Sequence, residues 1–316
     1  SEIFRAKSIL EGYKKIGCDV INIGQYEILN GLKFLKEITK DNGIPFVSAN
    51  LRETKTSQLI FEPYQIIEKN QLKFGIIGVT NLLPDTCKQI NSDNFIDAGN
   101  KYIKELSDKT DFVIILVNAD RSSQSDLVEK FPQADFIVTS GSTNMSRANS
   151  PQEENGPYMY SCGKQGKHLL VLEGNVSDSK QPLVDVSSHT KKVSDINRRF
   201  KRLQKKDPKK TLEEIYSDQQ NILKLIKQYR IDIENSQNII SNAVNTLEYK
   251  TIALNSKIKD DPELLAFVDS SLETCNKLNP TLKTKDNNTK KKPKKRINTA
   301  KKKFNSKSKD HSGHNH

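Results

Sequence analysis

The sequence predicts an α/β fold in which a sheet lies between helical layers, followed by a helical region and a basic tail. Segments with helical spacing of apolar residues alternate with short β-rich segments through the first half of the chain. The continuous apolar run Val113–Val117 is typical of a strand that is covered on both faces. After Lys191 the apolar spacing changes to a heptad pattern. We therefore divide the chain into an α/β domain at 1–190, a helical region at 191–279 and a tail at 280–316.

Each element of the α/β domain follows from a local pattern. Helices are expected where apolar residues recur every three or four positions, and strands where β-branched and aromatic residues cluster between turn residues. Gly17 ends the first helix, and Lys69–Gln71 forms the turn between two strands. The last three strands are expected to have antiparallel character. The expected helices are 3–16, 29–41, 98–108 and 123–131, and the expected strands are 18–23, 45–49, 64–68, 72–79, 111–117, 135–139, 158–161, 168–173 and 183–186.

The heptad pattern covers residues 212–254, where core positions are separated alternately by three and four residues. It predicts either one long helix or a helical hairpin that turns at Asn235–Asn238, and self-association through 212–254 is an expectation. A further helix is expected at 262–278, with Pro262 in its first turn. The heptad positions are Leu212, Ile215, Gln219, Ile222, Ile226, Tyr229, Ile233, Ser236, Ile240, Ala243, Leu247, Lys250 and Leu254.

The net charge of +12 comes from two segments and not from the fold as a whole. Residues 191–210 have 10 basic and 2 acidic side chains, residues 281–316 have 13 and 2, and the rest of the chain is net acidic. Apolar residues recur at helical spacing within 191–210. This segment is therefore either a basic amphipathic helix for anionic lipid or nucleic acid, or a docked helix with a solvated basic face.

The tail from Pro280 has almost no large apolar residues, so it is expected to be disordered. Its lysines would attract a polyanion or an anionic membrane surface through counterion release. Phe304 is its single aromatic residue, so no sequence-specific nucleic-acid binding is expected. His311, His314 and His316 either bind a transition metal weakly or belong to a flexible polar terminus. The candidate polyanion-binding residues are Lys290, Lys291, Lys292, Lys294, Lys295, Arg296, Lys301, Lys302 and Lys303.

The cysteines and the beginning of the chain give only limited information. Cys18, Cys87, Cys162 and Cys275 show no CxxC or related spacing, which argues against a zinc knuckle and a haem attachment site. No apolar run approaches the ~20 residues that a membrane-spanning helix needs. The chain begins at Ser1 without a signal pattern, so either a leader has been removed or the chain is an internal fragment.

Several motifs follow one another in a defined order within residues 1–175. Gly24–Glu27 is similar to a G-N-H-E motif, and Asp111–Asn118 is similar to a D-x-V-I-x-L-x-H strand. Ala134–Asn144 is similar to a D-x-I-x-G-G-H-x-H motif. In this order the motifs resemble the 5′-nucleotidase family of calcineurin-like metallophosphoesterases. The resemblance implies a layered β-sandwich flanked by helices, with the first strands of the family's domain lying before Ser1.

The resemblance also assigns the positions of a two-metal centre. Two cations in such a centre lower the pKa of a bound water and clamp the phosphoryl oxygens, which requires imidazole, carboxylate and amide ligands. Those positions are substituted here, and no histidine precedes His168. The family's catalytic histidine position is Tyr26, whereas the supporting carboxylate is retained as Glu27. The family's metal-ligand positions fall on Gln25, Asn118, Ser142 and Asn144.

These substitutions predict a degenerate, non-catalytic domain that acts in binding or assembly through its helical region and cationic tail, with no cofactor. The alternative is a divergent metal-dependent phosphoesterase, a hydrolase of nucleotides or other phosphate esters with two divalent metal ions, whose remaining ligands lie upstream of Ser1. Asp19 and Asp120 are further acidic residues that the resemblance places near the site. The helical region occupies the place of the family's nucleoside-binding domain. The family is largely exported, so the resemblance implies the periplasm or cell envelope.

Overall fold

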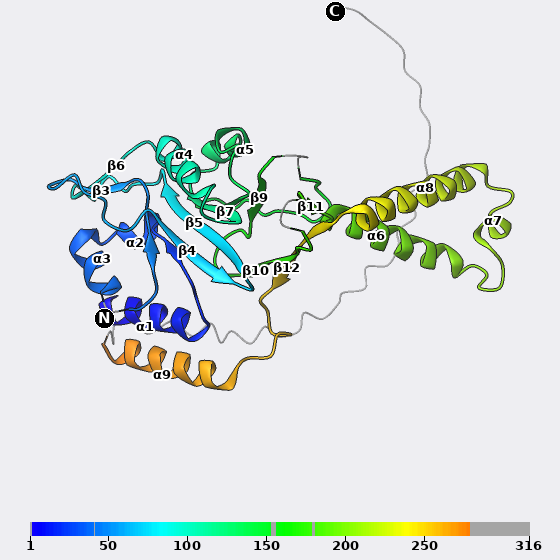
Figure 1. Cartoon of the computed structure of the whole chain (residues 1–316). Helices are drawn as coiled ribbons and strands as arrows, with labels where there is room; N and C mark the ends of the chain where they lie inside the picture. The colour runs from blue at the N-terminus through cyan, green and yellow to red at the C-terminus, as the bar shows by residue number, and fades with distance from the viewer. Residues whose placement is uncertain (1, 41, 153–155, 179–180, 279–316) are drawn as a thin grey trace, which may run out of the picture.

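The computed structural model describes residues 2–40, 42–152, 156–178 and 181–278, and its centre is a five-stranded sheet (Figure 1). In spatial order its strands are β4 (Tyr64–Lys69), β5 (Leu72–Thr80), β7 (Phe112–Asn118), β8 (Phe136–Ser140) and β9 (Tyr158–Ser161). β4 and β5 form the expected antiparallel hairpin, and β5, β7, β8 and β9 run parallel to one another. All parallel strands therefore end at the same edge of the sheet.

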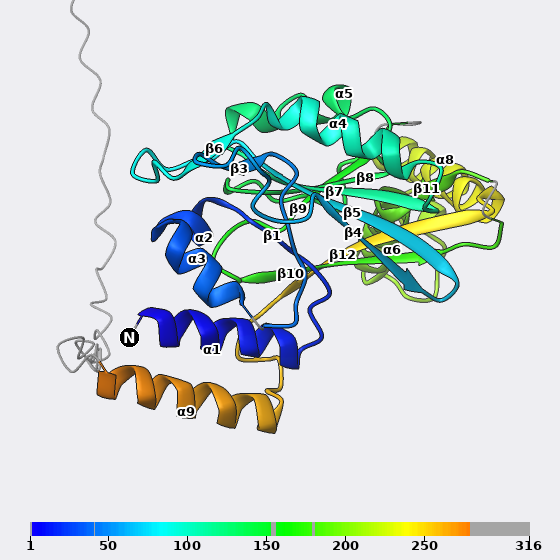
Figure 2. The same cartoon turned by 60° about the vertical axis from the view of Figure 1, so that its left-hand side comes forward.

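Helices α4 (Phe95–Leu106) and α5 (Leu127–Lys130) cover one face of this sheet (Figure 2). Asn94 caps α4, because its side-chain oxygen accepts the backbone N–H groups of Ile96 at 2.8 Å and Asp97 at 3.2 Å. The expected helix at 123–131 is divided into the short 3₁₀ helix η1 (Ser122–Gln124) and α5. The buried core between helices and sheet includes Ile77, Val79, Ile103, Leu106, Val113, Ile115, Val117, Leu127 and Phe131.

A second core lies around the parallel pair β1 (Ile21–Asn22) and β2 (Phe46–Val47). Helices α1 (Glu2–Lys15), α2 (Gln25–Ile28) and α3 (Gly31–Thr39) contribute to it. The side-chain amide of Asn22 donates to the carbonyls of Val79 at 3.1 Å and Leu116 at 3.0 Å. This amide therefore ties β1 to β5 and β7. The sequence patterns missed one antiparallel pair here, β3 (Leu51–Glu53) with β6 (Ile90–Ser92).

The other sheet face is covered partly by a three-stranded sheet, in the order β10 (His168–Asn175), β12 (Asn245–Ala253) and β11 (Leu183–Asp185). β12 is antiparallel to β10 and parallel to β11, and β9 is parallel to β8. The expected antiparallel character of the last strands is thus correct for β10 only. The side chains of Phe136, Tyr160, Leu247 and Tyr249 form the buried core between the two sheets.

The expectation of helix throughout 212–254 is wrong for its last part, which forms β12. Alternate residues of this strand, Asn245, Leu247 and Tyr249, are buried, as a strand with one covered face requires. Lys250, a heptad position, is exposed and forms an ion pair with Glu173 of β10 at 2.5 Å. Tertiary pairing along the full length of β10 therefore determines the conformation, and the local three-and-four spacing does not.

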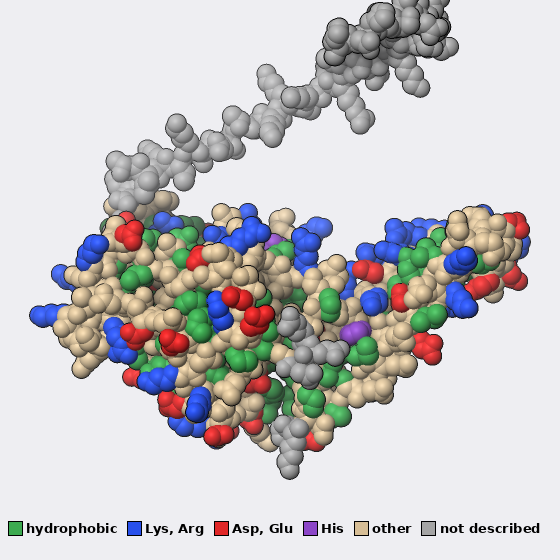
Figure 3. Space-filling model, turned by 90° about the horizontal axis from the view of Figure 1, so that it is seen from above, with side chains coloured by type: hydrophobic (Ala, Val, Ile, Leu, Met, Phe, Trp, Pro, Cys, Tyr) green, Lys and Arg blue, Asp and Glu red, His purple; other side chains and the backbone are tan. Residues whose placement is uncertain are grey.

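A helical arm connects β11 to β12 and projects from the body of the molecule (Figure 1). It consists of α6 (Ser187–Gln204), α7 (Leu212–Ile215) and α8 (Gln220–Asn242). α8 runs without interruption through 235–238, so the alternative turn at these residues is also wrong. The heptad residues Leu212, Ile222 and Ile226 pack inside the arm against Phe200 and Leu203 of α6. Most basic side chains of α6 remain exposed, and many Lys and Arg side chains line the arm in Figure 3.

The last described helix, α9 (Pro262–Leu278), begins at the expected proline and lies beside α1 in both cartoon views (Figures 1 and 2). The ammonium group of Lys15 lies 5.2 Å from the centroid of the Phe267 ring, which connects the two helices. Among the described residues, no helix has the length and apolar character needed to cross a membrane. The expectations for the tail at 280–316, including its disorder and its lysine and histidine residues, lie outside the described residues.

Candidate functional site

The positions that the sequence assigned to metal ligands come together where β1, β5, β7 and β8 end. Gln25 follows β1, and Asn118 is the last residue of β7. In the sheet register Asn118 lies between Thr80 of β5 and Ser140 of β8. Ser142 follows β8 by two residues. These residues therefore lie near one edge of the sheet.

Asn118 is the centre of a closed hydrogen-bond network. Its side-chain oxygen accepts the backbone N–H of Gln25 at 3.1 Å and the hydroxyl of Thr80 at 3.0 Å. Its side-chain nitrogen donates to the hydroxyl of Ser140 at 2.9 Å. The residue is 8% exposed. A Cβ atom on Gly24 would lie 2.9 Å from the side-chain Cγ of Asn118, so glycine permits this close approach.

Ser142 and Asn144 belong to a neighbouring network around Gln124. The hydroxyl of Ser142 donates to the side-chain oxygen of Gln124 at 2.7 Å, and the side-chain nitrogen of Asn144 donates to the same oxygen at 3.0 Å. The amide nitrogen of Gln124 donates to the carbonyls of Ala119 and Ser140, both at 2.8 Å. Gln124 is buried, and sequence reasoning missed it because η1 shows no periodic pattern. The one signal in the sequence that could have pointed to Gln124 is its position six residues after Asn118, the last residue of β7.

The acidic residues near this edge are already engaged by the protein. Glu27 accepts the backbone N–H of Gly24 at 2.9 Å and so caps the short helix α2. Asp120 accepts hydrogen bonds from the side chain of Asn81 and from the hydroxyl and backbone N–H groups of Ser122 and Ser123. The Ser122 hydroxyl, followed by the two Ser123 donors, holds the pKa of Asp120 well below its usual range.

Asp19 does not belong to the site, contrary to the sequence expectation. Its carboxylate pairs with the ammonium group of Lys69 at 2.5 Å. Lys69 ends β4 and lies opposite Leu72, at the start of β5. Asp19 is therefore at the sheet edge opposite the one that holds Asn118.

The resemblance assigns Tyr26 to the position of the family's catalytic histidine. Its side chain is 69% exposed, and it makes no hydrogen bond or ion pair with the described residues. A phenol in this environment has no neighbouring base that would activate it for proton transfer at neutral pH. The structure thus shows an exposed tyrosine, without the hydrogen-bond partner that orients a general acid or base.

The residues at this edge do not fit a two-metal centre. The side-chain oxygen atoms at this edge belong mostly to neutral amides and hydroxyls. Neutral ligands do not balance the charge of two divalent metal ions. Within the described ranges, no three His, Cys, Asp or Glu side chains gather closely enough to hold a metal ion. The buried ligand positions Asn118 and Ser142 use their polar atoms in hydrogen bonds to neighbours. No catalytic step can be assigned to these groups.

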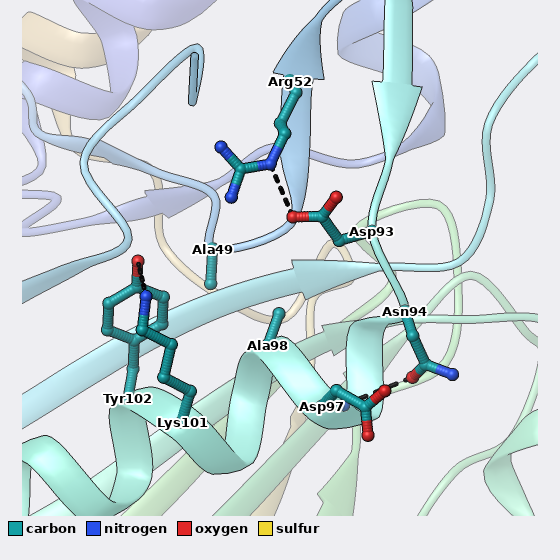
Figure 4. Close-up of a pocket in the computed structure, with 8 residues that line it drawn as sticks. All are labelled: Ala49, Arg52, Asp93, Asn94, Asp97, Ala98, Lys101 and Tyr102. Atoms are coloured by element: carbon teal, nitrogen blue, oxygen red, sulfur yellow. Dashed lines mark hydrogen bonds and ion pairs between the residues drawn. The ribbon is translucent and has the colours of Figure 1, made fainter. Parts of the chain in front are cut away.

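A separate cavity of about 240 Å³ lies beside the first turn of α4 (Figure 4). Its charged side chains neutralise one another. Arg52 points to Asp93, with 2.6 Å between the guanidinium nitrogen and the carboxylate oxygen, and Asp97 of α4 also lines the cavity. The ammonium group of Lys101 lies 4.8 Å from the centroid of the Tyr102 ring. This balance leaves no excess charge with which to recognise a charged ligand.

Comparisons with known proteins agree with the motifs. No family model matches the sequence. The chain is 33% identical over 97 residues to Protein UshA of Yersinia enterocolitica, a match that covers 31% of this chain and 17% of that protein. It is 30% identical over 129 residues to a 5′-nucleotidase of Vibrio cholerae, covering 37% and 23%. The chain thus spans about a fifth of the length of these curated relatives.

A solved structure extends the similarity beyond the matched residues. A putative 5′-nucleotidase from Staphylococcus aureus in complex with α-ketoglutarate covers 84% of this chain, and the chain covers 44% of it. The TM-score is 0.51 at 11% identity, which shows a shared fold. The ordered motifs, the layered α/β structure and the sequence relatives lead to one conclusion. These findings support the resemblance of the chain to the 5′-nucleotidase family of calcineurin-like metallophosphoesterases.

Proposed function

We propose that this domain is a degenerate 5′-nucleotidase-like scaffold that is non-catalytic and acts in binding or assembly. The observation that carries this proposal is the hydrogen bonding of Asn118, whose oxygen and nitrogen are both engaged by neighbouring residues. Turning its oxygen toward a cation would break two hydrogen bonds in a buried place. Each such bond contributes about 1 kcal/mol, and an unpaired buried donor costs about 1–3 kcal/mol. A neutral amide offers no charge to offset this cost.

Metal content and hydrolysis together test the proposal. The purified chain is dialysed against Mn²⁺, freed of loose metal and assayed with p-nitrophenyl phosphate and with adenosine monophosphate. We expect well under one equivalent of metal and no hydrolysis above the buffer rate. Two tightly held equivalents, lost together with activity in a Glu27→Ala variant, would overturn the proposal. The melting temperature of Glu27→Ala serves as the folding control, because Glu27 also caps α2.

The second candidate is a divergent metal-dependent phosphoesterase, which two observations favour. Glu27 is retained at its motif position, and Gln25 and Asn118 meet at the sheet edge that a two-metal centre would use. This candidate needs carboxylate and imidazole ligands from a longer protein. The same metal and hydrolysis measurements on the full-length gene product decide between the candidates, since stoichiometric metal that appears only in the longer protein supports the enzyme.

Binding by the scaffold is proposed to involve the helical arm and the cationic tail. On the arm, the exposed basic residues Lys192, Arg198, Arg199, Lys201 and Arg202 support contact with a polyanion or an anionic membrane surface. We expect co-sedimentation with phosphatidylserine vesicles at low salt and release at high salt. Binding that persists at high salt, or equal binding to neutral vesicles, contradicts an electrostatic contact.

We also propose self-association of the chain through residues 212–254. Ile222 and Ile226 already pack against α6, but Leu225, Ile231 and Ile239 of α8 are exposed. Sedimentation equilibrium of the wild type and of a Leu225→Ser variant tests whether this apolar surface associates. Export to the periplasm or cell envelope is likewise proposed from the family resemblance, and cell fractionation of the native protein tests it.

A further inference from the structure

Four lysines surround one cavity that lies apart from the substituted metal positions. The cavity has a volume of about 550 Å³ and is bounded by α3, by β3 with the turn that follows it, and by the segment before β6. Lys33 and Lys36 come from α3, and Lys55 and Lys88 come from the other two walls. Leu32 is buried and provides an apolar surface. Cavities of this size hold small organic ligands.

The charges of this lysine pocket are unbalanced. Its single carboxylate, Glu53, pairs with Lys36 at 3.3 Å. Lys33, Lys55 and Lys88 form no ion pair or side-chain hydrogen bond with the described residues. Three ammonium groups around one cavity repel one another, and an anion placed between them removes that repulsion. The cavity of Figure 4, by contrast, is lined by two basic and two acidic side chains, so its charges are balanced.

The backbone holds the walls of the lysine pocket in place. The backbone N–H of Thr54 donates to the carbonyl of Gln89 at 2.9 Å, and its hydroxyl donates to the carbonyl of Lys88 at 3.1 Å. These bonds join the wall that carries Lys55 to the wall that carries Lys88. Lys55 and Lys88 therefore belong to backbone segments that are hydrogen-bonded to each other, although both side chains are exposed.

The first turn of α3 adds positive potential to the same cavity. Leu32 and Lys33 belong to this turn, and Asn30, which precedes the helix, makes no side-chain cap hydrogen bond. Backbone N–H groups at the beginning of a helix carry partial positive charge and favour anions. The N-terminus of α3 therefore adds to the preference for anions that the lysines create.

We propose that the lysine pocket binds a small anion that carries two or more phosphate groups. Three unpaired lysines on separate walls favour a ligand that carries negative charge at more than one point over a single phosphate. Lysine binds phosphate as a point charge and needs no defined ligand plane. None of the pocket residues belongs to the networks of Asn118 or Gln124, so binding here does not depend on hydrolysis.

Lysine acetylation footprinting with inorganic pyrophosphate as the probe tests where the anion binds. The intact chain is treated with a limiting acetylating reagent, with pyrophosphate or with sodium chloride at equal ionic strength. We expect slower acetylation of Lys33, Lys55 and Lys88 with pyrophosphate and unchanged acetylation of Lys101. Orthophosphate should protect them less at the same concentration. Equal slowing at Lys101, or protection confined to Lys205 and Lys206 of the arm, overturns the pocket.

Calorimetric titration with pyrophosphate then tests the contribution of individual lysines. Lys33→Gln and Lys88→Gln should each weaken binding about two- to fivefold, as expected for an exposed ion pair, and the double variant should combine the losses. Lys101→Gln is the matched control, because Lys101 lines the balanced cavity. The inference fails if the control weakens binding as much as the pocket variants, or if the double variant binds like the wild type. Unchanged melting temperatures confirm that all variants are folded.

Discussion

The hydroxyl of Tyr160 donates to the carboxylate of Asp185 at 2.5 Å and joins the two sheets of the domain. Tyr160 is fully buried in β9, and Asp185 ends β11. The second carboxylate oxygen of Asp185 accepts the backbone N–H of Ser187 at 2.8 Å. One side chain therefore connects the five-stranded sheet, the three-stranded sheet and the beginning of the arm.

Replacing Tyr160 by phenylalanine should destabilise the domain. The change removes the buried hydroxyl and leaves one oxygen of Asp185 without its partner, which costs about 1–3 kcal/mol. Urea unfolding of Tyr160→Phe measures the loss. Tyr13→Phe is the matched control, because Tyr13 is exposed and makes no hydrogen bond with the described residues. Equal midpoints for Tyr160→Phe and the wild type would contradict a structural role for this hydrogen bond.

The same tyrosine predicts the behaviour of the protein at high pH. Burial, and then the hydrogen bond to Asp185, raise the pKa of Tyr160 above its usual value of 10.0. Above that pH the unfolded chain loses this proton and the folded chain retains it, so stability falls as pH rises. The difference in unfolding midpoint between wild type and Tyr160→Phe should therefore shrink between neutral pH and pH values above 10. A constant difference across this window argues against the prediction.

Asp120 gives a pH dependence of the opposite sign. The pKa of Asp120 in the folded protein lies below its usual value of 3.8, so its contribution to stability is present above that pH and is lost as the pH falls further. Urea midpoints of the wild type and Asp120→Asn at neutral pH and near pH 3 measure this contribution. We expect the advantage of the wild type to shrink in acid. An advantage that grows in acid is the contrary outcome.

Gly78 should not tolerate a side chain. A Cβ atom there would lie 2.4 Å from the side-chain oxygen of Asn22 and 2.7 Å from the carbonyl oxygen of Val47. Gly78→Ala therefore forces a shift of buried backbone and should cost roughly 1–3 kcal/mol. Gly12→Ala is the control, because its nearest neighbour would be at 3.8 Å and alanine favours the helix by about 0.5–1 kcal/mol. Thermal unfolding checks the prediction, since the melting temperature should fall for Gly78→Ala and rise for Gly12→Ala.

The strand assignment of β12 makes a prediction that a heptad helix does not. Leu247 is 2% exposed and Ile252 is 39% exposed, so Leu247→Ala should cost about 2–5 kcal/mol and Ile252→Ala much less. Chemical unfolding compares the two variants. Hydrogen exchange adds an independent measure, because the backbone amides of β12 that pair with β10 should be protected from exchange. Similar losses for both variants would weigh against the alternating burial.

The sequence predicted most long elements because their apolar spacing is unambiguous. β7 shows a continuous apolar run, and α9 begins at Pro262 as expected. β3 and β6 are three residues each, which is shorter than a periodic pattern can reveal. β12 was misassigned because Leu247 fits both a heptad and an alternating strand pattern, and only its pairing with the distant β10 separates the two. Non-local pairing is not encoded in local spacing.

For the candidate site, the motifs predicted which residues meet, but not what they do. The resemblance assigns Gln25 and Asn118 to one centre, and in the structure the backbone N–H of Gln25 donates to the side-chain oxygen of Asn118 at 3.1 Å. Gln124 was missed, since its two accepted and two donated hydrogen bonds appear only in the folded chain. The lysine pocket was missed for the same reason, because its residues come from three separate segments without common spacing.

The attachment of the arm has a mechanical consequence. The hydroxyl of Ser187, at the first residue of α6, accepts the backbone N–H of Tyr249 in β12 at 2.7 Å, while its own N–H donates to Asp185 in β11. The base of the arm is thus clamped between two neighbouring strands, without a hinge of free residues. A load applied at the far end of the arm is therefore expected to act on the three-stranded sheet that contains β11 and β12. At α6 the arm is therefore joined to the sheet by fixed hydrogen bonds and not by a flexible linker.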